Sequence, residues 1–112
     1  MQRIHLGEFE ELILLLVAIL HEDAYGVAVM EALEEQAGRS VNISAVHAAL
    51  RRLESKGFVN SYWSESTAER GGRRKRIFNI TQAGRVALEQ SRDIYLKLWQ
   101  QIPGFSPRLS IL

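Results

Sequence analysis

The feature that most constrains this chain is the order of segments between residues 42 and 76. The run NISAVHAALRRLESKGFVNSYW continues through an expected tight turn into ERGGRRKRIFNI. This order predicts a helix with arginines on its outer side, a glycine stop, and a β-hairpin whose tip is basic. A protein that inserts a helix into a nucleic-acid groove and grips the flanking phosphates with a hairpin needs these parts in this order.

The charge of the chain is unevenly distributed and supports the same interpretation. Residues 39–76 carry nine Lys and Arg against three Glu, a net charge of +6. The remaining residues carry five basic and ten acidic side chains, so the overall net charge is only +1. Because nucleic-acid binding depends on local charge, the basic segment indicates such binding although the whole chain is nearly neutral.

Length and composition limit the other choices. With 112 residues, 46% hydrophobic and 24% charged, the chain has the size and composition of one ordinary globular domain. It has no cysteine, which excludes disulfides, thiolate metal sites and a cysteine nucleophile. The apolar run at 12–20 is too short to span a bilayer, and the glutamates before it are wrong for a signal peptide. We therefore expect a cytoplasmic protein without a membrane partner.

Periodicity and capping residues predict the order α-α-(β)-α-β-β-α, a mainly α fold with a small β-hairpin. The first two helices are expected at 8–21 and 25–37, the second opened by Asp23 and stopped at Gly38. A short extended segment at 41–43 leads to a third helix at 45–56, with Ser44 as its N-cap and Gly57 as its end. Two strands follow at 58–64 and 74–80, joined across Gly71 and Gly72, before Thr81 caps a last helix at 82–102 that Pro103 helps to end.

The third predicted helix has two distinct faces. Its apolar stripe consists of Val46, Ala49, Leu50 and Leu53. The opposite face is small and polar near its start and basic further along, and Lys56 follows at its end; it comprises Ser44, His47, Ala48, Arg51, Arg52 and Ser55. Small side chains let a backbone approach a groove floor, Arg51 can reach a phosphate or a guanine edge, and His47 can hydrogen-bond to either. The alternative is an ordinary solvated face.

The hairpin tip is the more specific signal for nucleic acid. Five cations fall within seven residues around two glycines: Arg70, Arg73, Arg74, Lys75 and Arg76. Like charges this close repel one another, so the cluster makes sense if phosphates neutralise it and release their counterions. The alternative is a solvated loop tip. The run lacks the Gly-Lys-Ser/Thr ending of a nucleotide-binding loop, and no helix follows it directly.

The last predicted helix carries a seam with heptad spacing, formed by Gly84, Leu88, Ser91, Tyr95, Leu98 and Ile102. The first predicted helix is apolar nearly all round, more than a small monomer easily covers. Together these two features predict a homodimer interface; the alternative is packing within one subunit. Trp99 follows Tyr95 by one turn, so the two rings are either interface anchors or a platform for a flat ligand.

Nothing in the sequence points to catalysis or to a cofactor. The histidines at positions 5, 21 and 47 are scattered, and none has a partner at metal-ligand spacing. No group of residues supplies a nucleophile, a base and an orienting residue together. We therefore expect a protein that is not an enzyme and that holds no metal.

These segments resemble the PadR family of bacterial transcriptional regulators, which are compact winged helix-turn-helix proteins. The resemblance covers most of residues 8–90 and is carried by ELILLLVAIL, AYGVAVMEAL, SAVHAALRRLESKGFVNSYW and RIFNITQAGRVAL. Its most specific part is LRRLESKGFV, followed after the hairpin by I-T-x-x-G. It implies a winged helix-turn-helix domain at 1–81 and a C-terminal dimerisation helix and tail at 82–112, forming one compact unit.

The resemblance also implies a function. Such proteins are usually repressors that bind a pseudo-palindromic DNA operator as homodimers, with the third helix in the major groove and the wing on the backbone or minor groove. Family members often respond to small aromatic or amphipathic effectors, and Tyr95 matches the position of a ligand-stacking aromatic residue. This chain departs from the family by having His47 in place of the usual Tyr, and Val27 where an aromatic residue is common.

We therefore expect a dimeric DNA-binding repressor that responds to a small ligand. Two alternatives remain open at this point. One is a winged-helix protein-interaction module whose basic hairpin holds an acidic partner. The other is an architectural DNA binder that works without a ligand.

Overall fold

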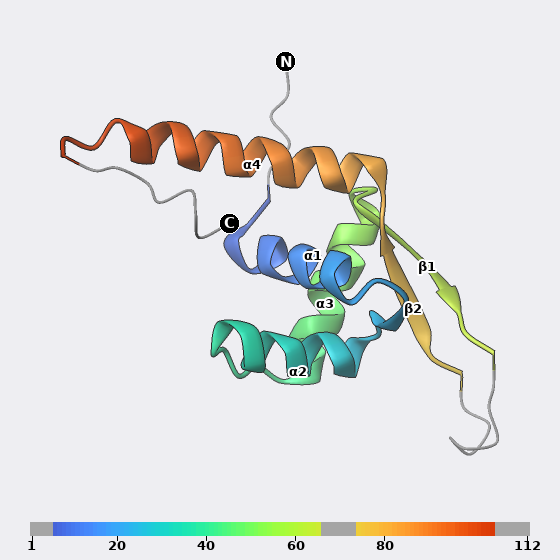
Figure 1. The fold of residues 1–112 in the computed structure, drawn as a ribbon. Helices are drawn as coiled ribbons and strands as arrows, with labels where there is room; N and C mark the ends of the chain where they lie inside the picture. The colour runs from blue at the N-terminus through green and yellow to red at the C-terminus, as the bar shows by residue number, and fades with distance from the viewer. Residues whose placement is uncertain (1–5, 66–73, 105–112) are drawn as a thin grey trace.

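The computed structural model describes residues 6–65 and 74–104 (Figure 1). In chain order the described elements are α1 (Glu8–Leu20), a 3₁₀ turn η1 (His21–Asp23), α2 (Gly26–Ala37), α3 (Ile43–Ser55), β1 (Val59–Trp63), β2 (Arg76–Ile80) and α4 (Gln82–Gln100). The expectation of a mainly α fold with a β-hairpin wing is confirmed.

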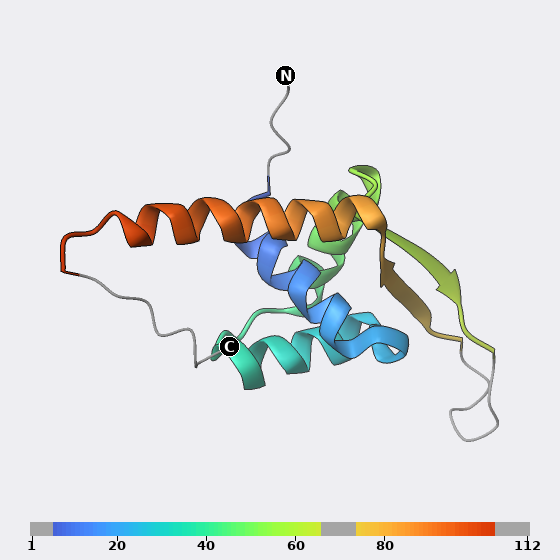
Figure 2. The ribbon, with the colours of Figure 1, turned by 45° about the horizontal axis from the view of Figure 1, so that its top comes forward.

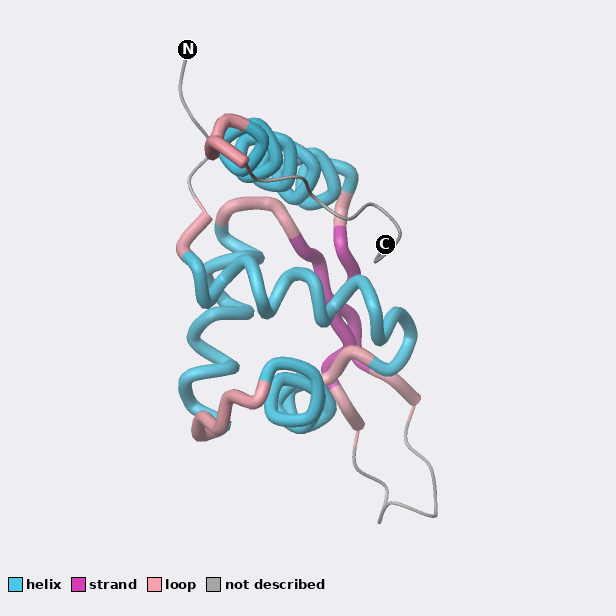
Figure 3. Tube along the Cα trace, turned by 60° about the vertical axis from the view of Figure 1, so that its left-hand side comes forward, coloured by secondary structure: helices cyan, strands magenta, loops and turns pink. Residues whose placement is uncertain are grey.

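Helices α1, α2 and α3 pack around a shared apolar core. The fully buried side chains include Ile13 and Leu14 of α1, Leu33 of α2, and Leu50 and Leu53 of α3. The hairpin lies at one side of this bundle, and α4 runs across α1 and extends well beyond the bundle (Figures 1 and 2). The tube in Figure 3 shows the two strands running side by side next to the helices.

The hairpin is a two-stranded antiparallel sheet with a defined register. Val59 pairs with Ile80 at its base and Trp63 pairs with Arg76 at its far end. The backbone N–H of Phe78 donates to the carbonyl oxygen of Ala24, just after η1, at 2.8 Å. This bond fastens β2 to the helical bundle, so the start of the wing has a fixed position relative to α3.

Several predicted boundaries are confirmed by backbone geometry. Gly38 and Gly57 follow α2 and α3 with φ angles of 64° and 80°, a left-handed conformation that favours glycine. The Thr81 hydroxyl accepts a hydrogen bond from the backbone N–H of Gly84 at 3.0 Å, which caps α4 as expected.

Three predicted details differ from the structure. Asn42, not Ser44, caps α3: its side-chain oxygen accepts from the backbone N–H of Ala45 at 2.9 Å, and Ser44 lies inside the helix. The expected extended segment at 41–43 is shortened: Asn42 is extended, with φ −80° and ψ 161°, but α3 already begins at Ile43. Asp23 does not open α2, because it lies in η1 and α2 begins at Gly26 after Tyr25.

Helix α4 divides into a packed half and a protruding half. A Cβ at Gly84 would clash with the Phe58 carbonyl oxygen, so only glycine allows the first turn of α4 to sit against the start of the hairpin. Leu88 is half-buried against the core of the same subunit. Beyond it, five large apolar side chains are exposed by 43% to 56%: Ile94, Tyr95, Leu98, Trp99 and Ile102.

Candidate nucleic-acid interface

The two predicted faces of α3 are present in the structure. The side chains of Val46, Ala49, Leu50 and Leu53 are completely buried. On the opposite face, Ala48 is half-buried and the remaining predicted residues are exposed, namely Ser44, His47, Arg51, Arg52 and Ser55. An open depression on this face is lined by Ala48, Arg51, Arg52, Ser55 and Lys56. The outer face is therefore hollowed, and three cations surround the hollow.

A buried carboxylate of α1 holds two of these cations. Glu10 is only 7% exposed. Its Oε2 accepts from Nε of Arg52 at 2.7 Å, and its Oε1 accepts from Nζ of Lys56 at 2.6 Å. The backbone N–H of Gly7 adds a longer bond at 3.4 Å. These contacts tie the second half of α3 to the start of α1.

The surroundings of Glu10 keep it ionised. Burial by itself raises the pKa of a carboxyl, but the hydrogen bonds from Lys56 and Arg52, the charge of Lys56 and the Gly7 N–H together outweigh it. The pKa of Glu10 therefore lies below its ordinary value of 4.5. At neutral pH the group is one anion between two cations.

A second ion pair joins α3 to the wing. Glu54 of α3 accepts from Nη2 of Arg76 at 3.0 Å and from the Ser61 hydroxyl at 2.7 Å. Nε of Arg76 in turn donates to Ser61 Oγ at 2.9 Å. Since Ser61 and Arg76 belong to the two strands, this network fixes the orientation of the wing relative to α3.

The start of the basic loop is also held in place. The ammonium group of Lys75 lies 3.4 Å from the centre of the Tyr25 ring, a cation–π contact with the residue before α2. Arg74 is exposed and has no ion pair with another described residue. Arg70, Arg73 and the two glycines of the expected turn lie outside the described residues.

His47 has a neighbour that the sequence did not reveal. A Cβ placed on Gly26 would lie 2.7 Å from Cε1 of the His47 ring. A side chain at position 26 would therefore displace the imidazole. The absence of a side chain at Gly26 lets His47 lie against the first turn of α2, at the edge of the outer face of α3.

The positive charge available to a ligand is smaller than the sequence count indicates. Arg39 pairs with Glu8 at 2.7 Å, Arg52 and Lys56 pair with Glu10, and Arg76 pairs with Glu54. Within the described part of segment 39–76, three cations have no ion pair with another described residue: Arg51, Arg74 and Lys75. Two of the neutralising carboxylates come from α1, so a count limited to the basic segment missed them.

The structure thus brings the predicted residues of α3 and the wing base onto adjoining surfaces and adds residues that sequence reasoning missed. The added residues are Glu10, Tyr25, Glu54 and Ser61. Glu10 had a detectable signal: it precedes the buried residues Leu14 and Val17 by four and seven positions, so it belongs to the inward stripe of α1. An acidic residue in such a stripe needs a cation nearby.

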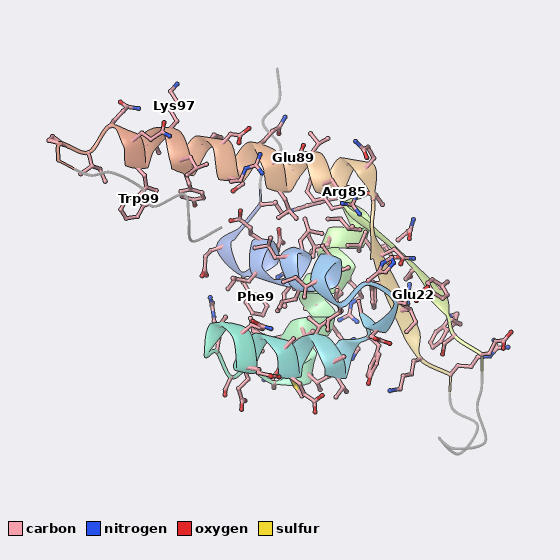
Figure 4. All side chains as sticks on the ribbon, viewed as in Figure 1. Phe9, Glu22, Arg85, Glu89, Lys97 and Trp99 are labelled. Carbon is pink, nitrogen blue, oxygen red and sulfur yellow. The ribbon has the colours of Figure 1, made fainter. Side chains whose placement is uncertain are left out.

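The predicted dimer and effector residues lie on a different surface. Tyr95, Leu98, Trp99 and Ile102 are exposed on the protruding half of α4, whereas Leu88 is half-buried within the subunit. Figure 4 shows Trp99 and Lys97 on opposite sides of this part of the helix. On α1, Leu15 and Ile19 are 41% and 63% exposed.

The described residues contain no group of three or more His, Cys, Asp or Glu side chains that could hold a metal ion. None of the described helices is long and apolar enough to cross a membrane.

Comparison with known proteins gives consistent results. The sequence model of the transcriptional regulator PadR-like family matches residues 14–90. A PadR-like transcription factor from Bacteroides fragilis is 25% identical, with 86% of this chain and 87% of that chain covered and a TM-score of 0.73. A PadR family regulator from Clostridium difficile R20291 is 29% identical, with 88% and 100% covered and a TM-score of 0.62. No curated protein matches the sequence.

The Glu10 ion pairs predict a pH-dependent contribution to stability. Because the pKa is lowered in the folded state, the contribution is present above about pH 4.5 and is lost as the pH falls through the folded pKa. We expect Glu10→Gln to lower the free energy of unfolding by about 1–3 kcal/mol at pH 7. The difference from the native protein should shrink towards pH 2 in urea titrations. Glu31→Gln, an exposed position on α2, is the control; a Glu10→Gln deficit that does not change with pH contradicts the assignment.

Proposed function

This chain belongs to the PadR-like family of transcriptional regulators, and we propose that it is a homodimeric repressor that releases its DNA operator in response to a small aromatic or amphipathic ligand. It is a DNA-binding transcription regulator by family and fold. The finer proposal is best supported by the presence of two separate exposed surfaces on one small chain. One is the hollowed, cationic outer face of α3, and the other is the exposed apolar half of α4.

In the proposed complex, α3 enters the major groove with its outer face towards the bases. Arg51 has no ion pair with another described residue, and one helical turn separates it from Ala48 and Ser55 on either side. Small neighbours let the helix approach, so Arg51 is suited to a guanine edge. Ser44 and His47 lie nearer the start of the helix on the same face. Arg52 and Lys56 lie at the edge of this face, where they would be close to the phosphates.

The wing is proposed to hold the flanking backbone or minor groove. Among the described residues, Arg74 is the best candidate for this phosphate contact, because it is exposed and adjoins Lys75 and Arg76. Arg70 and Arg73 complete the basic cluster in the sequence. The Glu54 network gives the wing a fixed angle to α3, so both elements can engage one face of the duplex.

Dimerisation is proposed to cover the apolar part of α4. A row of exposed residues that includes Tyr95, Leu98 and Ile102 is costly to leave in water. Leu15 and Ile19 of α1 are exposed apolar residues that a partner's α4 could cover. A two-fold pair would present two α3 helices to half-sites about one helical turn, roughly 34–36 Å, apart.

Ligand response is proposed to act through the same interface. Tyr95 and Trp99 are about half exposed and lie one turn apart, so two rings are available to a flat compound. A ligand bound there would change the angle between the subunits and hence the spacing of the two α3 helices. A shift of a few ångströms would prevent both helices from engaging at once.

Two substitutions should separate sequence reading from phosphate holding. We expect Arg51→Ala to weaken binding to the operator more than binding to random DNA, by about tenfold or more, since a base contact is worth about 1–3 kcal/mol. Arg74→Ala should weaken both about equally and flatten the dependence of log K on log salt by roughly one unit. Fluorescence anisotropy at several salt concentrations measures both effects.

The control for this pair is Arg85→Ala, an exposed cation on α4 that lies outside α3 and the wing (Figure 4). Arg85→Ala should change neither the affinity for DNA nor the slope of log K against log salt. Absence of binding by the native protein at low salt contradicts the DNA interface and favours a protein-interaction module. If the salt slope of Arg74→Ala equals that of the native protein, Arg74 does not contact a phosphate.

The dimer interface predicts a charge-sensitive position on α4. Leu98→Glu puts a carboxylate into the proposed interface, so we expect a dimer of the native protein to become a monomer in sedimentation velocity runs at tens of micromolar, roughly the range of a moderate association. Lys97→Glu, on the neighbouring residue, is the matched control and should remain dimeric. A monomeric native protein, or a Leu98→Glu variant that stays dimeric, contradicts this interface.

The ligand site predicts a fluorescence response from Trp99. Planar aromatic dyes should quench the tryptophan emission of the native protein. The quenching should disappear in Trp99→Leu, in which Trp63 still fluoresces. A panel of such dyes titrated against both proteins makes the test. If none quenches the native protein, the chain is better described as a regulator without an aromatic effector.

A further inference from the structure

The wing carries a large aromatic side chain that none of the contacts above explains. Trp63 is the last residue of β1 and is 60% exposed, more than any other aromatic residue in the described part of the chain. A tryptophan has the largest apolar surface of any side chain, and exposing most of it on a small domain is unfavourable without a partner. The environment of the indole indicates what that partner is.

The register of the hairpin places Trp63 on the face that adjoins α3. Trp63 is paired with Arg76, and Ser61 is paired with Phe78, so these side chains share one face of the sheet. The neighbouring aromatic residue, Tyr62, is paired with Ile77 and belongs to the opposite face. Tyr62 is also exposed, by 45%. Two exposed aromatic residues therefore lie on opposite faces of one strand.

Contacts lead stepwise from the outer face of α3 to Trp63. Arg51 and Glu54 are three residues apart on α3 and hence neighbours on its surface. Glu54 binds Arg76 at 3.0 Å, and the Arg76 guanidinium lies 5.9 Å from the centre of the Trp63 ring. The indole thus continues the surface proposed to face DNA, on the wing side of Arg51.

The backbone around Trp63 is held firmly enough to present the ring. The N–H of Ser64 donates to the Lys75 carbonyl oxygen at 2.7 Å, and the N–H of Lys75 donates to Ser64 Oγ at 2.9 Å. These bonds continue the pairing of the strands one residue beyond Trp63. Lys75 itself is anchored on the Tyr25 ring. The backbone that carries Trp63 therefore has a defined position before any ligand binds.

We propose that Trp63 is a DNA-contacting residue of the wing, whose indole packs against deoxyribose at the edge of the minor groove next to the half-site read by α3. The proposal rests on the DNA interface inferred above. Proteins that bind the minor groove often place apolar side chains there. An indole offers a large apolar surface that can cover a sugar. Its contribution is a contact that salt does not screen.

Charge complementarity favours DNA over a second protein surface as the occupant. Arg76 lies directly across the sheet from Trp63 and is paired with Glu54, and the exposed Arg74 lies two residues before Arg76. A partner with anionic groups beside an apolar patch, as a sugar–phosphate backbone has, fits this surface. Trp63 does not belong to the same apolar surface as the exposed residues of α4. The protruding half of α4 points away from the wing (Figure 2).

The test compares the two faces of the same strand. A duplex that the native protein enriches from a random-sequence pool is the probe, and binding is measured for Trp63→Ala and Tyr62→Ala over a range of salt concentrations. We expect Trp63→Ala to weaken binding roughly tenfold with an unchanged salt slope, because no charge is lost. Tyr62→Ala should bind like the native protein.

A second measurement avoids dependence on folding of the alanine variant. In a Trp99→Phe background, Trp63 is the remaining tryptophan of the chain. Adding the selected duplex should alter its emission and shield it from acrylamide. A scrambled duplex at high salt is the control and should leave the acrylamide quenching unchanged.

The outcomes separate this proposal from the function on which it rests. If the native protein enriches no duplex, the DNA interface fails. If it binds its duplex but Trp63→Ala matches the native affinity, or Tyr62→Ala is impaired equally, the contact assigned to Trp63 is overturned. Acrylamide shielding of Trp63 that increases with protein concentration without DNA would assign the indole to a second copy and also overturn the proposal.

Discussion

The arrangement of this domain depends on one buried carboxylate. Glu10 lies on the inward stripe of α1 and binds both Arg52 and Lys56 of α3. Removing either cation would leave a buried negative charge poorly compensated, which is costly, so the two helices keep a fixed relation. The same α1 exposes Ile19 near its other end, on the surface proposed to meet a second subunit. One helix therefore connects the helix proposed to face DNA, the core and the proposed dimer interface, and a change at that interface can reach α3 through a stiff element.

The ion pairs also divide the basic residues into two groups, one structural and one available for binding. Arg52, Lys56 and Arg76 are held by carboxylates and mainly fix the positions of α3 and the wing. Arg51 and Arg74 have no ion pair with a described residue and are suited to binding phosphates or bases. Binding by such a surface costs little reorganisation, because the paired cations do not have to leave a buried anion. Affinity is then governed by a few outward cations rather than by the total basic charge.

Local sequence signals predicted the fold well and the site only in part. The apolar stripe of α3, the cap at Thr81 and the stop at Gly57 are all encoded within one or two helical turns, where periodicity and backbone preferences act. The start of α3 was misplaced because Asn42 and Ser44 are both good N-caps, and only the backbone geometry decides between them. The Glu10 pairs join residues 42 and 46 positions apart, so no local pattern specifies them. The contact between Gly26 and His47 depends on helix packing in the same way.

In the proposed complex, two copies of the outer face of α3 enter successive major grooves of one duplex. The chain has no cysteine, so Ser55→Cys provides a single attachment point on that face for an iron chelate that cleaves nearby DNA. On a selected duplex, we expect two clusters of cuts one helical turn, roughly 10 base pairs, apart. Lys97→Cys, on α4, should give none. A single cluster would contradict the paired arrangement, and equal cleavage from both attachment points, or none from Ser55→Cys, would contradict the DNA face itself.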